Sequence, residues 1–167
     1  QGGRHPFCRA TAFTSNYPDK WATLLPLIDE CGEVYRQVAP LRYKAQMEAV
    51  SETPKDYIIG SSPFTTVTVN NSVPAAYHQD GGDLKKGTGI LLGFEHGSFD
   101  GFELVVPEYR FAVRVKTRDV LLFNPLVWHG NIPPYNQVGE KDEDWYRISV
   151  VLYFREHITG CLPLKEE

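Results

Sequence analysis

Two short segments of this sequence carry side chains that could bind one metal ion. The first is His78-Gln79-Asp80, in which residues two apart project to the same face of an extended chain. The second is His129, which follows the apolar run Val120–Phe123. Two imidazoles and one carboxylate form the facial triad of non-haem Fe(II) oxygenases, which leaves coordination positions open for co-substrate and oxygen. A surface histidine and a turn aspartate would give the same bare pattern, so the triad needs support from elsewhere.

That support comes from a charged residue in an apolar strand. Arg147 opens the last apolar run of the sequence, in which Ser149 is the next polar side chain. The two share one face of the strand, and they point inward if Val150 and Leu152 point outward. An inward guanidinium needs an anion, and a planar carboxylate binds it bidentately. The alternative is pairing with a protein acid such as Asp144; we favour the carboxylate of a co-substrate.

The elements that must position these residues follow from the periodicity. Apolar residues at three- and four-residue steps predict a helix that begins at Leu25–Leu27 and ends at Pro40, and a sparser pattern predicts a second over Leu41–Val50. After Pro54 the sequence changes to short β-branched runs between turn residues, typical of strands. The expected strands cover residues 57–59, 64–70, 89–94, 102–106, 111–115, 120–123 and 148–154. Two helices followed by seven or eight strands predict a β sandwich or barrel supported by helices.

Composition limits the number of domains and the class of partner. The chain has 167 residues, 42% of them hydrophobic, which predicts a single domain over 1–167, with helical support in 1–55 and a β core in 56–161. The net charge of −4 gives no general attraction to nucleic acid. Residues 1–118 hold 13 basic and 13 acidic side chains, whereas 119–167 hold 4 and 8.

One local cluster of basic residues departs from that balance. Four basic residues lie at even-numbered positions of an expected strand: Arg110, Arg114, Lys116 and Arg118. Side chains at such positions point to the same face, so these four could follow a phosphate backbone. The alternative is an ordinary solvated sheet face.

The three cysteines indicate a reducing environment. Cys8, Cys31 and Cys161 are far apart and odd in number, which argues against a disulfide framework. There is no 18-residue apolar stretch and no secretory leader, and the chain begins at Gln1 rather than Met, as a trimmed or excised domain would. We expect a soluble intracellular protein that does not interact with membranes.

Beyond these local patterns, the span from Pro63 to Cys161 resembles the oxygenase domain of the TET/JBP family, iron(II) and 2-oxoglutarate dioxygenases that oxidise the 5-methyl group of pyrimidines in DNA. The order and spacing of the motifs are most similar to the J-binding-protein branch, which hydroxylates thymine, and to compact phage and bacterial relatives. The matching stretches are Phe64–Asn70, Ala76–Leu84, Gly87–Leu91, Asp119–Phe123, Trp128–Asn131 and Arg147–Arg155.

The resemblance implies a fold, a set of cofactors and a site. The fold would be a double-stranded β-helix, a cupin-like jelly roll, with the N-terminal helices packed on one sheet. Fe(II) would be held by His78, Asp80 and His129, and 2-oxoglutarate by Arg147, with Ser149 and Asn70 as further contacts. O2 would be the oxidant. Asp83 would contact the target base, although it could equally be a turn residue paired with a nearby lysine.

The expected reaction is hydroxylation of a pyrimidine methyl group in DNA, with decarboxylation of 2-oxoglutarate to succinate and CO2. The partner would be DNA, either single-stranded or with a flipped base, because a methyl group inside a duplex cannot reach the iron. We expect a monomer in the nucleus of a eukaryote or the cytoplasm of a bacterium or phage host. Three alternatives stay open: the same chemistry on a free nucleotide or other small molecule, a non-enzymatic binding barrel, and a zinc hydrolase.

Overall fold

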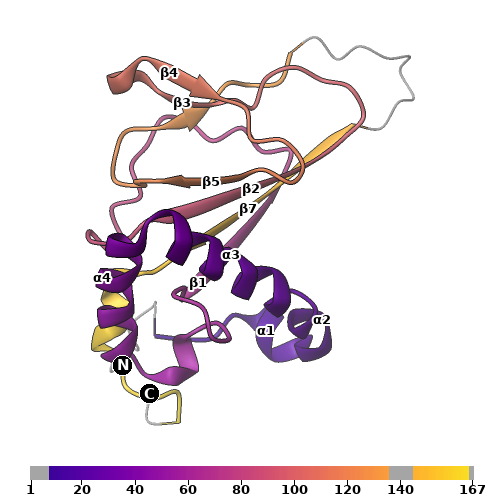
Figure 1. The fold of residues 1–167 in the computed structure, drawn as a ribbon. Coiled ribbons are helices and arrows are strands. Elements are labelled where there is room, and N and C mark those ends of the chain that lie inside the picture. Colours follow the sequence, from indigo (N-terminus) through magenta and orange to yellow (C-terminus); the bar gives the residue numbers. More distant parts are fainter. Residues whose placement is uncertain (1–7, 136–144, 166–167) are drawn as a thin grey trace, which may run out of the picture. The chain divides into compact units, whose positions relative to one another are not determined.

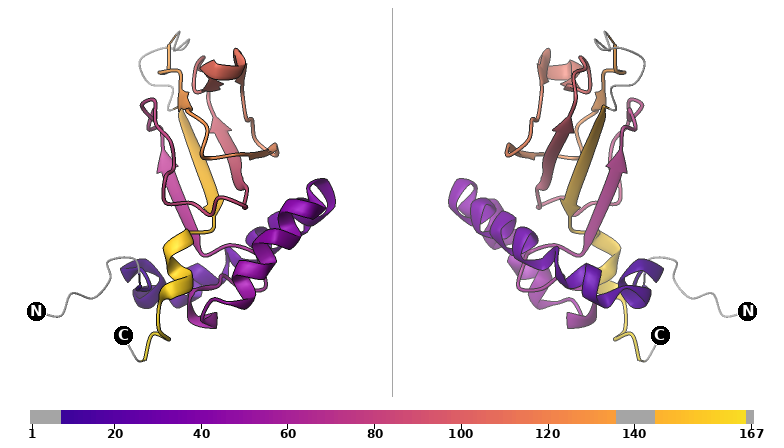
Figure 2. Two further views of the ribbon diagram at one scale, coloured as in Figure 1. Left: turned by 90° about the vertical axis from the view of Figure 1, so that its left-hand side faces the viewer. Right: turned by 90° about the vertical axis from the view of Figure 1, so that its right-hand side faces the viewer.

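The chain folds into two compact units in a computed structural model that describes residues 8–135 and 145–165. The first unit takes in the chain up to Thr66, the segment Gly82–Thr88 and the chain from Leu152 onward. The second takes in Val67–Gly81 and Gly89–Val151. Figures 1 and 2 show the helices and strands of both units. The single-domain organisation over residues 1–167 stays a prediction.

The first unit is helical. Its helices are α1 (Ala12–Asn16), α2 (Pro18–Ala22), α3 (Leu25–Val38) and α4 (Pro40–Ser51), followed by the 3-10 helix η1 (Lys55–Tyr57). A second 3-10 helix, η3 (Glu156–Gly160), follows the last strand. The two predicted helices are confirmed as α3 and α4, because a proline in the first turn of each has the backbone angle that a helix requires.

A buried amide connects α3, α4 and the segment 82–88. Gln46 of α4 is fully buried, and its side-chain nitrogen donates to the carbonyl oxygen of Pro63 at 2.7 Å. Its side-chain oxygen accepts from the Tyr35 hydroxyl of α3 and from the Thr88 backbone N–H, each at 3.1 Å. Gly32 lets α3 approach this network closely, since a Cβ there would lie 2.9 Å from Pro63 Cδ. Both polar atoms of the buried Gln46 amide are therefore hydrogen-bonded, and these bonds hold the neighbouring segments in place.

The second unit is built from two sheets. One has four strands in the order β1 (Thr66–Asn71), β7 (Tyr146–Tyr153), β2 (Gly89–His96) and β5 (Val120–Phe123). The other has three strands in the order β4 (Phe111–Val113), β3 (Leu104–Val106) and β6 (Gly130–Asn131), with the 3-10 helix η2 (Pro107–Tyr109) between β3 and β4. β2 pairs antiparallel with β5, and β3 pairs antiparallel with both β4 and β6 (Figure 1). β7 is an interior strand of its sheet, and residues on both of its faces are buried.

Two strand predictions differ clearly from the structure, and one short strand was not predicted. Residues 57–59 do not form a strand; η1 ends at Tyr57, whose ring is buried against η3 and the chain end. The strand expected over 111–115 ends at Val113. β6 has two residues, too few to produce a periodic signal.

The prediction of unpaired cysteines is wrong for two of the three. Cys8 and Cys161 form a disulfide, and both are buried in a cluster with Tyr57 and Ile158. Their sequence separation of 153 residues explains why spacing gave no sign of the pair. Cys31, on the buried face of α3, is a free thiol.

Among the described residues, none of the helices is both long and apolar enough to cross a membrane.

Candidate functional site

The structure brings the three predicted metal ligands together. One ligand atom from each of His78, Asp80 and His129 lies within 4.8 Å of the others. The Nε2 atom of His78 is 3.4 Å from one Asp80 carboxylate oxygen, and the Nε2 atom of His129 is 3.6 Å from the other. Metal–nitrogen bonds of about 2.1 Å would place neighbouring ligand atoms about 3 Å apart. The three side chains therefore need only small adjustments to hold one ion.

Backbone hydrogen bonds hold the two histidines side by side. His78 and His129 exchange N–H to carbonyl bonds of 2.8 and 2.9 Å as an isolated antiparallel bridge. Asp80 is fixed from the other side, because its backbone N–H donates to the carbonyl of Pro125 at 3.0 Å. These backbone contacts thus bring two motifs that are distant in the sequence into one cluster.

The hydrogen bonds of the imidazoles also set which nitrogen is free. Nδ1 of His78 lies 2.6 Å from the carbonyl oxygen of Ala76, and Nδ1 of His129 lies 2.8 Å from that of Val127. A carbonyl oxygen only accepts, so each Nδ1 carries a proton, and in the neutral imidazole the lone pair is then on Nε2. This is the arrangement of metal-binding histidines, whose second nitrogen donates to a carbonyl.

The cluster opens to solvent on one side. The His129 side chain is 5% exposed and contacts the Phe123 ring edge-on, whereas those of His78 and Asp80 are 41% and 34% exposed. A bound ion would therefore be anchored in the protein at His129 and reached from outside past His78 and Asp80.

Arg147 is a buried cation without a hydrogen-bond partner on two of its nitrogens. The residue is 3% exposed, and Nε and Nη2 are buried with no acceptor among the described residues. Its guanidinium lies 5.5 Å from the centroid of the Phe102 ring. Burial holds the pKa of Arg147 below its usual range, opposed by Glu95 and reinforced by Arg114. An unpaired buried guanidinium is energetically costly, so this group is suited to an incoming anion.

The backbone of Arg147 is clamped by the end of β1. Its carbonyl accepts from the Ser72 N–H at 2.7 Å, and its own N–H donates to the Ser72 hydroxyl at 3.1 Å. Ser72 adopts a φ of 52°, a left-handed conformation that is uncommon for a residue with a side chain. Sequence reasoning missed Ser72, and its only signal is its place directly after a strand.

The other predicted contacts lie at different places. Ser149 is buried two residues along β7 from Arg147, on the same face by strand alternation. Val150 and Leu152, on the other face of β7 by strand alternation, are buried too. Asn70 is half-buried on β1, the neighbour of β7 in the sheet.

Asp83 belongs to the first unit. It is 7% exposed and forms an isolated bridge with Arg155. Its role at a base stays a prediction, and Asp144, the alternative partner of Arg147, lies outside the described residues.

The predicted basic face is wrong. β4 ends at Val113, so none of the four basic residues lies in a strand, and Arg110 and Arg118 have positive φ values of 54° and 77°. Arg114 is half-buried and paired with Glu95. Lys116 and Arg118 are exposed, as a solvated loop requires.

Two exposed aromatic residues adjoin the metal ligands. Tyr77 and Trp128 each precede a histidine of the triad, and their rings stack with centroids 4.9 Å apart. They are 52% and 45% exposed. Sequence reasoning assigned neither residue a role, although their positions beside the two histidines were visible.

Comparison with known proteins agrees with this geometry. The sequence profile of the Tet_JBP family, described as the oxygenase domain of the 2OGFeDO superfamily, matches residues 1–156. The chain is 36% identical over 148 residues to thymine dioxygenase JBP1-B of Trypanosoma cruzi (strain CL Brener), covering 89% of this chain and 17% of the relative. It is 34% identical over 160 residues to thymine dioxygenase JBP1 of Trypanosoma brucei brucei, covering 96% and 18%. The chain thus spans less than a fifth of the length of these relatives.

The fold also matches a solved structure. NgTET1 in complex with 5mC DNA superposes with a TM-score of 0.70 at 14% identity, covering 94% of this chain and 60% of that one. This likeness confirms the expected class, a β-rich jelly-roll type with N-terminal helices. The chain belongs to the Tet_JBP family of oxygenase domains, in a superfamily that uses Fe(II), 2-oxoglutarate and O2.

Proposed function

We propose that this chain is a dioxygenase domain that hydroxylates the 5-methyl group of a pyrimidine in DNA, thymine or 5-methylcytosine, with decarboxylation of 2-oxoglutarate to succinate and CO2. The observation that carries the proposal is the buried, unpaired guanidinium of Arg147, in the same unit as the His78–Asp80–His129 cluster. A zinc hydrolase does not require such a cation, whereas binding of a 2-oxo diacid calls for both a metal and an anion anchor.

The donor set fits Fe(II) and 2-oxoglutarate. His78, Asp80 and His129 would hold the metal, and Arg147 would bind the distal carboxylate of the co-substrate with its unpaired Nε and Nη2. Ser149 and Asn70 would make further contacts to it. When bound, iron, 2-oxoglutarate and O2 together supply the oxidant for the methyl C–H bond, and the protein supplies orientation. The hydrogen bonds from Nδ1 to the carbonyl oxygens of Ala76 and Val127 favour the tautomer whose Nε2 lone pair can bind the metal.

The substrate class rests on the relatives and on the surface beside the site. The relatives above 30% identity are named thymine dioxygenases, which makes thymine the first base to test. The stacked, exposed Tyr77 and Trp128 offer faces on which bases of a single-stranded or flipped-out substrate would stack. Asp83 would accept a hydrogen bond from a base-edge N–H.

A second candidate is the same chemistry on a free nucleoside or nucleotide. The observation that favours it is the weak charge attraction to DNA, since the net charge is −4 and Arg114 is half-buried and paired with Glu95. A small substrate needs no phosphate-tracking surface.

One experiment separates the candidates. The protein is incubated with Fe(II), 2-oxoglutarate and, in parallel, a thymine oligodeoxynucleotide, its 5-methylcytosine counterpart, an RNA carrying 5-methyluridine, and free thymidine. Succinate is measured, and the nucleosides are weighed by mass spectrometry after hydrolysis. We expect hydroxymethyl product from DNA and none with His129→Ala. Product from thymidine alone would favour the small-molecule candidate, and no substrate-dependent succinate in any arm would favour a non-enzymatic barrel.

The remaining expectations follow from this function. We propose that residues 1–167 act as one catalytic domain and that the domain is monomeric. Its substrate would place it with DNA inside the cell, in the nucleus of a eukaryote or the cytoplasm of a bacterium or phage host.

A further inference from the structure

Among the described residues, Nε and Nη2 of Arg147 have no hydrogen-bond partner although carboxylates lie in its surroundings. Among charged side chains, Glu95 has the largest effect on the pKa of Arg147, and Glu103 also acts on it. A buried guanidinium next to a carboxylate would ordinarily form an ion pair. Glu95 is paired with a different group instead.

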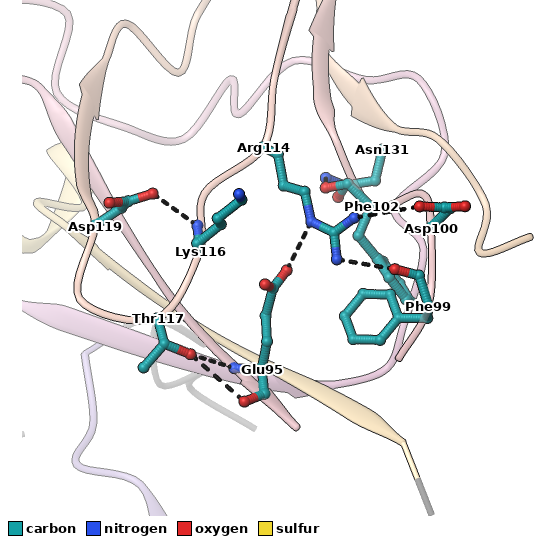
Figure 3. Close-up of polar contacts among 9 residues, drawn as sticks. All are labelled: Glu95, Phe99, Asp100, Phe102, Arg114, Lys116, Thr117, Asp119 and Asn131. Atoms are coloured by element: carbon teal, nitrogen blue, oxygen red, sulfur yellow. Dashed lines mark hydrogen bonds and ion pairs between the residues drawn. The ribbon is translucent and has the colours of Figure 1, made fainter. Parts of the chain in front are cut away.

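That group is Arg114. Its Nε donates to Glu95 Oε1 at 3.1 Å, and its Nη2 donates to the Phe99 carbonyl oxygen at 3.0 Å. Its Nη1 lies 3.9 Å from Asp100, and its guanidinium lies 4.8 Å from the centroid of the Phe99 ring. Figure 3 shows Arg114 held between Glu95 and the Phe99–Asp100 turn. Because the Glu95 side chain is only 16% exposed, this pair is screened less than a surface pair.

The two arginines flank one pair of aromatic rings. Arg114 contacts the ring of Phe99, Arg147 contacts that of Phe102, and these two rings meet edge to face with centroids 5.7 Å apart. β2, which carries Glu95, neighbours β7, which carries Arg147. Glu95 thus lies between two cations and is bonded to only one of them.

We propose that Arg114 is a positioning residue for 2-oxoglutarate: it holds the Glu95 carboxylate away from Arg147, so that Arg147 stays free for the co-substrate. The inference rests on the proposed function. Without Arg114, the half-buried Glu95 loses its counter-ion and turns to Arg147. The co-substrate must then displace a carboxylate already in place, and its affinity falls.

The test measures binding of 2-oxoglutarate directly. The co-substrate is titrated calorimetrically into Mn(II)-loaded protein, because Mn(II) allows 2-oxoglutarate to bind without turnover. The titration is done for wild type, Arg114→Met, Glu95→Gln and the double variant. A charge-assisted pair is worth enough to weaken binding about tenfold or more in Arg114→Met. Glu95→Gln removes the competitor, so the double variant should return to within about threefold of wild type, given typical errors of additivity. In steady-state assays the Arg114→Met change should raise KM for 2-oxoglutarate and leave kcat unchanged.

Two further variants control for charge and folding. Lys116→Met removes an exposed cation from the same segment, as Figure 3 shows, and should leave affinity unchanged. Arg114→Lys keeps a cation beside Glu95 and should bind nearly as wild type, even if Arg114→Met folds poorly.

The outcomes separate the inference from the proposed function. Wild-type affinity in Arg114→Met, or a double variant as weak as Arg114→Met, overturns the positioning role. If wild type itself does not bind 2-oxoglutarate, the proposed function fails instead.

Discussion

Replacing Arg147 with methionine should stabilise the cofactor-free protein while removing its co-substrate site. The methionine keeps most of the length of the apolar stem and removes the guanidinium over Phe102, a charge that has two buried nitrogens without acceptors among the described residues. An unsatisfied buried polar group costs about 1–3 kcal/mol, and more when charged. The free energy of unfolding should therefore rise by about 1–3 kcal/mol. At about 2–4 °C per kcal/mol for a chain of this size, Tm should rise by several degrees.

The assay is urea unfolding followed by circular dichroism, without metal or 2-oxoglutarate. Adding 2-oxoglutarate to protein already saturated with Mn(II) should raise the unfolding midpoint of wild type and raise that of Arg147→Met much less, since only wild type keeps the anion anchor. Arg36→Met is a suitable control, because Arg36 is an exposed arginine paired with Glu33 on α3, and its loss should not shift the midpoint measurably. Destabilisation of Arg147→Met would refute the reasoning, since it would mean that Arg147 already has a partner within the protein.

Three other changes have definite expected outcomes. Cys8→Ser should lower the free energy of unfolding by up to about 5 kcal/mol, because the disulfide joins residues 153 apart in sequence. Adding a reductant should lower the free energy of unfolding of wild type to that of Cys8→Ser. Burial raises the pKa of the Cys31 thiol to about 11 from an ordinary value near 9; the unfolded chain releases this proton first, so stability should fall between pH 9 and 11, and Cys31→Ala should remove that part of the slope in urea titrations. Trp128→Ala should raise KM for DNA roughly fivefold or more by loss of stacking without changing the 2-oxoglutarate affinity, whereas the exposed Tyr109→Ala should change neither.

The parts of the fold predicted well are those set by short-range rules. Pro26 and Pro40 mark the starts of α3 and α4 because a proline ring favours the first helical turn. The triad was predictable because His78 and Asp80 are two apart and His129 follows an apolar strand. A 2-His-1-carboxylate set is typical of non-haem Fe(II) oxygenases but also holds zinc in some hydrolases, so residue types alone limited the function to metal chemistry.

The parts missed depend on contacts between distant segments. The disulfide joins the two ends of the described chain, and no local spacing signals it. Gln46 looks like an ordinary polar helix residue until its amide is seen to bond Pro63, Tyr35 and Thr88. The Ser72 clamp on Arg147 likewise crosses 75 residues of sequence.

The charge pattern shows why parity alone misled. Four basic residues at even spacing predicted a cationic face, but that prediction assumed a continuous strand, and the chain leaves the strand at Val113. Once the strand ends, Arg114 is free to turn inward, where Phe99, Asp100 and Glu95 supply a ring, a carbonyl and two carboxylates. A half-buried arginine with that many partners stabilises the protein interior more than it could attract a phosphate in water. The arginines Arg114 and Arg147 thus act inside the second unit, and under the proposed function contact with DNA would fall to exposed side chains such as Trp128.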